Sequence, residues 1–130
     1  MENISVPVSP GEVLDKITIL EIKSERIADP GKVANVRFEL KLLQDTWNAA
    51  IEEDDVIRDL HSELRKINEV LWEIEDDIRD KERAGEFDAR FIELARAVYV
   101  TNDCRSEIKK RLNLHLGSRI IEEKSYQGYS

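Results

Sequence analysis

Apolar residues recur three and four positions apart in four stretches of the chain, with polar residues between them. This spacing places the apolar side chains on one face of an α-helix. A tail without this spacing follows the last stretch. The pattern therefore predicts one helical domain over residues 1–130, with helices over 10–27, 30–50, 55–83 and 88–116 and a tail over 118–130.

The third stretch has the most regular apolar seam. Its members are Ile57, Leu60, Leu64, Ile67, Leu71, Ile74 and Ile78. Strict alternation of three and four is typical of helices that pack nearly parallel or antiparallel. We therefore expect an all-α fold, an antiparallel four-helix bundle whose last two helices form a long coiled-coil hairpin.

Residues at the expected helix ends have the matching local chemistry. Ser9 precedes Pro10, and Asp29 precedes Pro30, so each pair reads as a helix cap followed by the first helical residue. Glu12 would complete a capping box with Ser9. Gly85 and Gly117 are expected to end the third and fourth helices.

A polar cluster interrupts the apolar face of the fourth stretch. Asn102, Arg105 and Lys109 occupy positions that apolar neighbours on both sides should bury. Buried polar groups need partners, and Glu21 and Glu75 border the facing seams. These five residues are the candidate binding site. Two interpretations stay open: a salt-bridge network that fixes register, or a small pocket for an anionic or polar ligand.

An acidic run in the third stretch offers an alternative with different chemistry. Carboxylates three and four residues apart can hold Mg²⁺, and the ExxD pattern resembles that of all-α nucleotide pyrophosphohydrolases. The resemblance implies a small Mg²⁺-dependent enzyme. The ExxE element of that family is missing, and the acids project away from the apolar seam, which favours a solvated face and no cofactor. The residues concerned are Glu73, Asp76, Asp77 and Asp80.

Some apolar residues lie away from the main stripes of the first two helices. They are Ile19, Ile22, Phe38 and Leu42. A second apolar surface shared by neighbouring helices indicates a partner, and we expect a homodimer through the backs of these helices. A further protein partner is also compatible with such a surface.

Charge and cysteine content limit the possible partners and the cellular compartment. The formal net charge is −8, which argues against nucleic acid or an anionic membrane as the main partner. The single cysteine allows no internal disulfide, and no apolar run reaches the roughly 20 residues of a membrane span. We expect a cytoplasmic, acidic protein.

Four blocks of sequence resemble a family of short uncharacterised bacterial proteins over nearly the whole chain. The blocks are VSPGEVLDKITILEIK, NEVLWEIEDDIRD, ELARAVYVTND and EEKSY. Some members are encoded near glycosyltransferase and surface-polysaccharide genes, and the resemblance implies no catalytic residues. The leading hypothesis is a non-catalytic binding or assembly module linked to surface-polysaccharide biosynthesis.

Overall fold

The computed structural model describes residues 1–128 and contains four α-helices and no strand in that range. The helices are α1 (Pro10–Arg26), α2 (Pro30–Ala50), α3 (Asp55–Ala84) and α4 (Ala89–His115). The all-helical prediction is confirmed, and the helix ends lie within a residue or two of those expected. Tyr129 and Ser130, the last two residues of the expected tail, lie outside the described residues.

Local capping explains where the helices begin. The Ser9 side chain accepts a hydrogen bond from the Glu12 amide at 3.2 Å, and Asp29 accepts one from the Gly31 amide at 2.9 Å. Asp54 and Asp88 cap α3 and α4 in the same manner. The expected capping box is incomplete, because the Glu12 carboxylate pairs with Lys109 on α4.

Positive backbone angles end the two long helices. Gly85 has a φ of 68° and Gly117 has a φ of 66°, a left-handed conformation that glycine adopts without steric cost. The chain therefore stops each helix at the predicted glycine.

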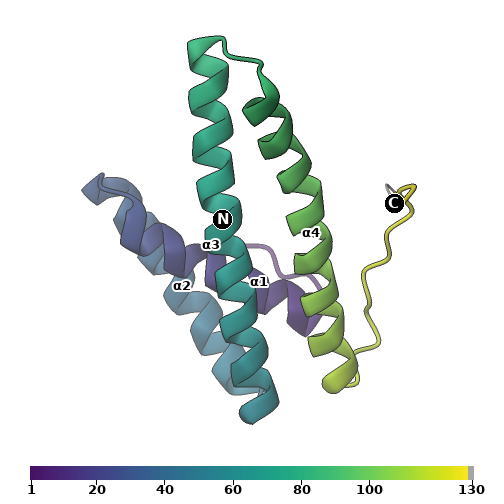
Figure 1. The fold of residues 1–130 in the computed structure, drawn as a ribbon. Coiled ribbons are helices and arrows are strands. Elements are labelled where there is room, and N and C mark those ends of the chain that lie inside the picture. The colour runs from purple at the N-terminus through teal and green to yellow at the C-terminus, as the bar shows by residue number, and fades with distance from the viewer. Residues whose placement is uncertain (129–130) are drawn as a thin grey trace.

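The first helix is the centre of the arrangement. Figure 1 shows α3 and α4 side by side, with α1 crossing them and α2 lying behind. Ion pairs of Glu63 with Arg111 and of Asp54 with His115 join the start of α3 to the end of α4, so these helices run antiparallel. The backbone of α1 approaches all three other helices, whereas α2 approaches α1 alone.

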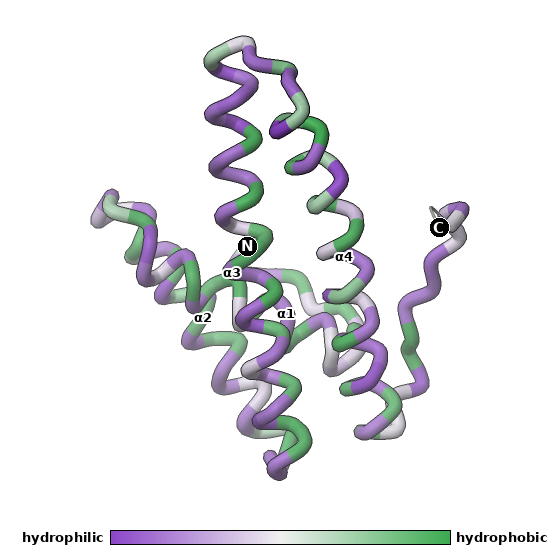
Figure 2. The backbone as a smooth tube through the Cα atoms, viewed as in Figure 1, coloured by the Kyte–Doolittle hydropathy of each residue, from purple (hydrophilic) through white to green (hydrophobic). Residues whose placement is uncertain are grey.

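The apolar core lies where α1 meets the other helices. Green hydrophobic positions alternate with purple hydrophilic ones along each helix in Figure 2, as amphipathic helices require. The main buried cluster consists of Leu14, Ile17, Trp47, Ile57, Leu60, Leu64, Ile108 and Leu112.

The central position of α1 corrects the expectation that Ile22 is open to a second copy of the chain. Ile22 is only 1% exposed, and Ile19 is half-buried, so this side of α1 is covered within the chain. The residues named on α2 are open, with Phe38 74% and Leu42 43% exposed. A helix packed on two sides buries more than one stripe, so the expectation that Ile22 faces a second copy of the chain was wrong.

Within residues 1–128, no helix has both the length and the apolar character needed to cross a membrane.

Candidate functional site

The buried carboxylate of Asp15 is the centre of the polar cluster. Asp15 lies on α1 and is 2% exposed. Arg105 Nε on α4 donates to both its oxygens, at 2.9 and 3.1 Å, and Arg105 Nη2 donates to Oδ2. Asn68 Nδ2 on α3 donates to Oδ1 at 2.9 Å. One carboxylate therefore joins three helices.

Neighbouring polar groups complete this network. Asn68 Nδ2 lies 2.8 Å from Thr18 Oγ1, and the Thr18 hydroxyl donates to the Asp15 carbonyl oxygen at 2.8 Å. No fully buried side-chain nitrogen or oxygen in the described part of the chain lacks a partner. The fully buried atoms of the network are thus satisfied by protein groups, which offsets the cost of burying them.

Arg105 stays protonated in this environment. Its hydrogen bond to Asp15 raises the pKa of the guanidinium, and this outweighs the opposing effect of burial. Arg105 Nη1 also points to Asn102 Oδ1, at a longer 3.4 Å. The Arg105 charge is therefore matched by Asp15.

A second cation lies one turn further along α4. Lys109 Nζ is 2.6 Å from Glu12, 3.0 Å from Glu122 in the tail and 3.9 Å from Asp15. Burial works against the charged ammonium, but hydrogen bonds to Glu12 and Glu122 leave the Lys109 pKa raised. Lys109 is consequently also charged and paired.

The start of α1 lies against α4 at close range. The Gly11 amide donates to Asn113 Oδ1 at 2.7 Å. A Cβ at Gly11 would lie 2.8 Å from the Lys109 carbonyl oxygen and 3.0 Å from Asn113 Oδ1. Only glycine allows this approach, which sets the position of Asp15 one turn later opposite Arg105.

The expected partners of Arg105 need correction. Glu21 pairs with His61 of α3 at 3.0 Å. Glu75 lies 3.4 Å from Arg79 at the surface. The structure brings Asn102, Arg105 and Lys109 together but supplies Asp15 and Glu12 as their carboxylates.

Asp15 and Thr18 were missed as members of the cluster. Asn68, an inward polar residue that borders the apolar seam of α3, was left out of the candidate site although it bonds to both. Gly11, Asp15, Thr18 and Ile22 follow helical spacing, yet only one of them is strongly apolar. This polar line was the available signal, because a helix enclosed by neighbours must also bury its second face.

Two acidic residues of the run on α3 pair with separate cations. Glu73 lies 3.6 Å from Arg26, and Asp80 lies 2.9 Å from Arg83. Among residues 1–128, no three His, Cys, Asp or Glu side chains are gathered as a metal ion would require.

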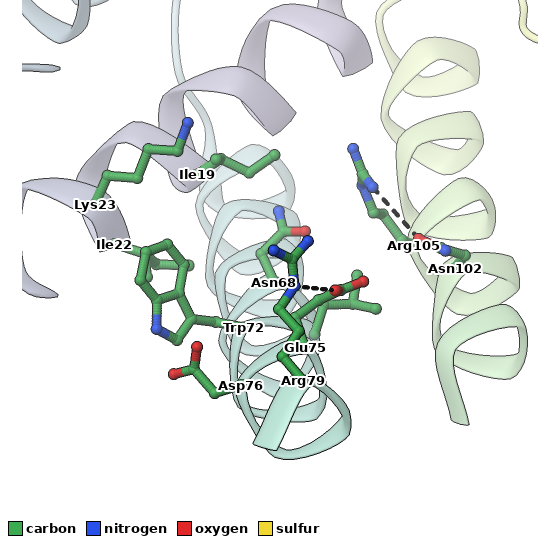
Figure 3. A pocket seen from close by; sticks show the side chains of 11 residues that line it. Ile19, Ile22, Lys23, Asn68, Trp72, Glu75, Asp76, Arg79, Asn102 and Arg105 are labelled. Atoms are coloured by element: carbon green, nitrogen blue, oxygen red, sulfur yellow. Dashed lines mark hydrogen bonds and ion pairs between the residues drawn. The ribbon is translucent and has the colours of Figure 1, made fainter. Parts of the chain in front are cut away.

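A cavity of about 490 Å³ lies beside the Asp15 network, between α1, α3 and α4. Figure 3 shows its lining, with Arg105 and Asn102 on one wall and Trp72 and Glu75 coming from α3. Glu75 thus lines the same cavity as Asn102 and Arg105, although it does not bond to either. Cavities of this size in proteins commonly bind small molecules.

A second cavity, of about 560 Å³, shares Asn102 and Arg105 and is bordered by the tail. Lys124 Nζ lies 3.2 Å from Asp103 Oδ1 and 5.8 Å from the centre of the Tyr126 ring. With the Lys109–Glu122 pair, these contacts hold the tail along α4.

These features define an all-helical protein with a charge-matched polar interior beside an open cavity. The chain belongs to a family of unknown function, DUF6165, whose model matches residues 4–129. The comparisons found no match among curated proteins and none among solved structures.

Proposed function

We propose that the protein is a non-catalytic binding and assembly module of the cytoplasm, with the cavity beside Arg105 as its binding site. The family resemblance to bacterial proteins encoded near surface-polysaccharide genes supports a role in that biosynthesis. The observation that carries the proposal is the charge-matched network around Asp15, which forms a fixed wall of the cavity.

The protonation of the site supports a role without proton transfer. A general acid or base works best with a pKa near the operating pH. Arg105 and Lys109 both have a raised pKa, so neither is prepared to exchange a proton near neutrality. Binding without chemistry is the function that fits these groups.

A thermal-shift series tests this proposal against the enzyme alternative. A ligand that binds only the folded state raises the melting temperature. We expect no rise with Mg²⁺ or Mn²⁺ and a panel of nucleoside triphosphates, and no release of phosphate from them. A metal-dependent rise accompanied by phosphate release would overturn the non-catalytic proposal.

The assembly half of the proposal concerns the outer face of α2. The backbone of this helix approaches only that of α1, and its stripe residues Leu40 and Leu43 pack against the core. Phe38 and Leu42 lie on the opposite side of α2 and are 74% and 43% exposed. We propose that a second copy of the chain covers the face of α2 that carries Phe38 and Leu42 and forms a homodimer. Ile22 is buried within the chain and takes no part.

Light scattering at micromolar concentration tests the homodimer. We expect twice the chain mass, and the monomer mass for Phe38→Glu. Asn48→Glu adds the same charge to an exposed position on another side of α2 and should leave the dimer intact. A monomeric mass for the unaltered protein contradicts the proposal.

The finer architecture is part of the same proposal. We propose an antiparallel four-helix bundle with a coiled-coil hairpin of α3 and α4. The ion pairs Glu63–Arg111 and Asp54–His115, which join the start of α3 to the end of α4, support this arrangement.

A further inference from the structure

We propose that the cavity between α1, α3 and α4 binds a neutral saccharide, with the apolar face of a sugar ring against Trp72. This inference rests on the proposed binding function and names its ligand class. Its support comes from the apolar floor of the cavity, from its charge and from its unpaired hydrogen-bonding groups.

The floor of the cavity is apolar and partly aromatic. Ile22 from α1 and Leu71 and Trp72 from α3 form it. Trp72 is half-buried, so part of its ring remains available to a ligand. The volume of about 490 Å³ lies within the roughly 300–1,000 Å³ of small-molecule sites.

The charges around the cavity sum to zero. Asp15 matches Arg105, and Glu75 matches Arg79 at 3.4 Å. Lys23 and Asp76 remain, and they have opposite signs. Figure 3 shows Lys23 extending from α1 and Asp76 from α3. An anionic ligand would meet Asp76 and a cationic one would meet Lys23, so a neutral ligand is favoured.

The cavity offers both donors and acceptors. Within the described residues, the Lys23 ammonium, Trp72 Nε1 and the Asn102 amide nitrogen have no protein acceptor. The Asp76 carboxylate and Asn68 Oδ1 have no protein donor. A hydroxyl group donates and accepts at once, so a polyhydroxylated ring can satisfy both kinds of group.

Tryptophan fluorescence tests the proposal in the full chain. The chain has two tryptophans, so Trp47→Phe leaves Trp72 as the sole reporter. We expect glucose, N-acetylglucosamine or maltose to change its emission with a Kd of about 1 mM or below. Calorimetry on the unaltered protein should give the same Kd.

Two variants locate the binding. Trp72→Leu and Asp76→Asn should each weaken calorimetric binding about tenfold or more, whereas Asp77→Asn, an exposed neighbour outside the cavity, should not. Glucose 1-phosphate should bind no more tightly than glucose. Saturable binding that Trp72→Leu leaves unchanged, or tighter binding of the phosphate, would overturn the inference.

The other outcomes separate the saccharide from the proposed function. If nucleosides or zwitterionic amino acids change Trp72 emission and neutral sugars do not, the ligand class is wrong but the binding function stands. If no compound of the three classes changes it, both the saccharide inference and the use of this cavity fail.

Discussion

The Asp15 carboxylate bonds to side chains of two other helices. It receives donors from α3 and α4 while lying on α1. Removing a charge from water costs several kcal/mol, and this cost is repaid only when geometry and additional hydrogen bonds are good. Asp15 receives hydrogen bonds from three donor atoms, two of Arg105 and one of Asn68, and these bonds offset the cost of its burial.

Asp15→Asn should reduce the free energy of unfolding by about 2–3 kcal/mol, because Arg105 loses its counter-charge inside the protein. The value is below that of a fully buried pair, since the Arg105 side chain is 28% exposed. Urea denaturation measures the change. Asp77→Asn on the exposed face of α3 is the control and should fall within about 0.5 kcal/mol of the unaltered protein.

The pair of His61 and Glu21 gives stability that depends on pH. The hydrogen bond to Glu21 raises the pKa of His61 above its usual value of 6.5. A raised pKa in the folded state stabilises the protein fully below pH 6.5, and this contribution is lost as pH rises through the folded pKa.

Unfolding of His61→Gln should therefore differ from that of the unaltered protein more at pH 5.5 than at pH 8.5. Urea denaturation at the two pH values measures the difference. An equal difference at both would show that the His61 charge contributes nothing.

At the level of elements, Gly11 allows the start of α1 to approach α4 closely. Gly11→Ala should destabilise the protein by about 1–3 kcal/mol, because its Cβ would meet the Lys109 carbonyl oxygen at 2.8 Å. Gly31→Ala is a matched control, since Gly31 also follows the proline at a helix start but its Cβ meets only Asp29 Oδ1 at 3.4 Å.

The control should be neutral or stabilise by up to about 1 kcal/mol, because alanine restricts the unfolded chain and favours a helix. Thermal and urea unfolding of both variants check the pair. Equal loss in the two variants would contradict the close approach of α1 to α4.

Elements were more predictable from sequence than their packing. Ser9, Asp29, Gly85 and Gly117 act on the backbone within a few residues, so their effect is visible locally. The partner of Arg105 was not visible, because Asp15 lies 90 residues away and its choice depends on how α1 crosses α4. The expectation for Ile22 was wrong for the same reason.

At the scale of the whole molecule, the tail is attached by few contacts. Glu122→Gln should speed tryptic cleavage after Arg119 several-fold, because Lys109 no longer holds the segment by charge. Global stability should fall by no more than about 1 kcal/mol, since Lys109 keeps Glu12 and the Glu122 side chain is 48% exposed. Glu123→Gln is the adjacent control and should cleave at the normal rate.

The crossing of α1 over the later helices has a consequence for synthesis. The ribosome makes α1 first, but its buried groups wait for Asn68, 53 residues later in the chain, and for Arg105. Until then Asp15 stays hydrated and α1 cannot bury its second face. The nascent chain should therefore resist proteolysis only after α4 has left the exit tunnel, and stalled chains of increasing length would show protection arriving in one late step.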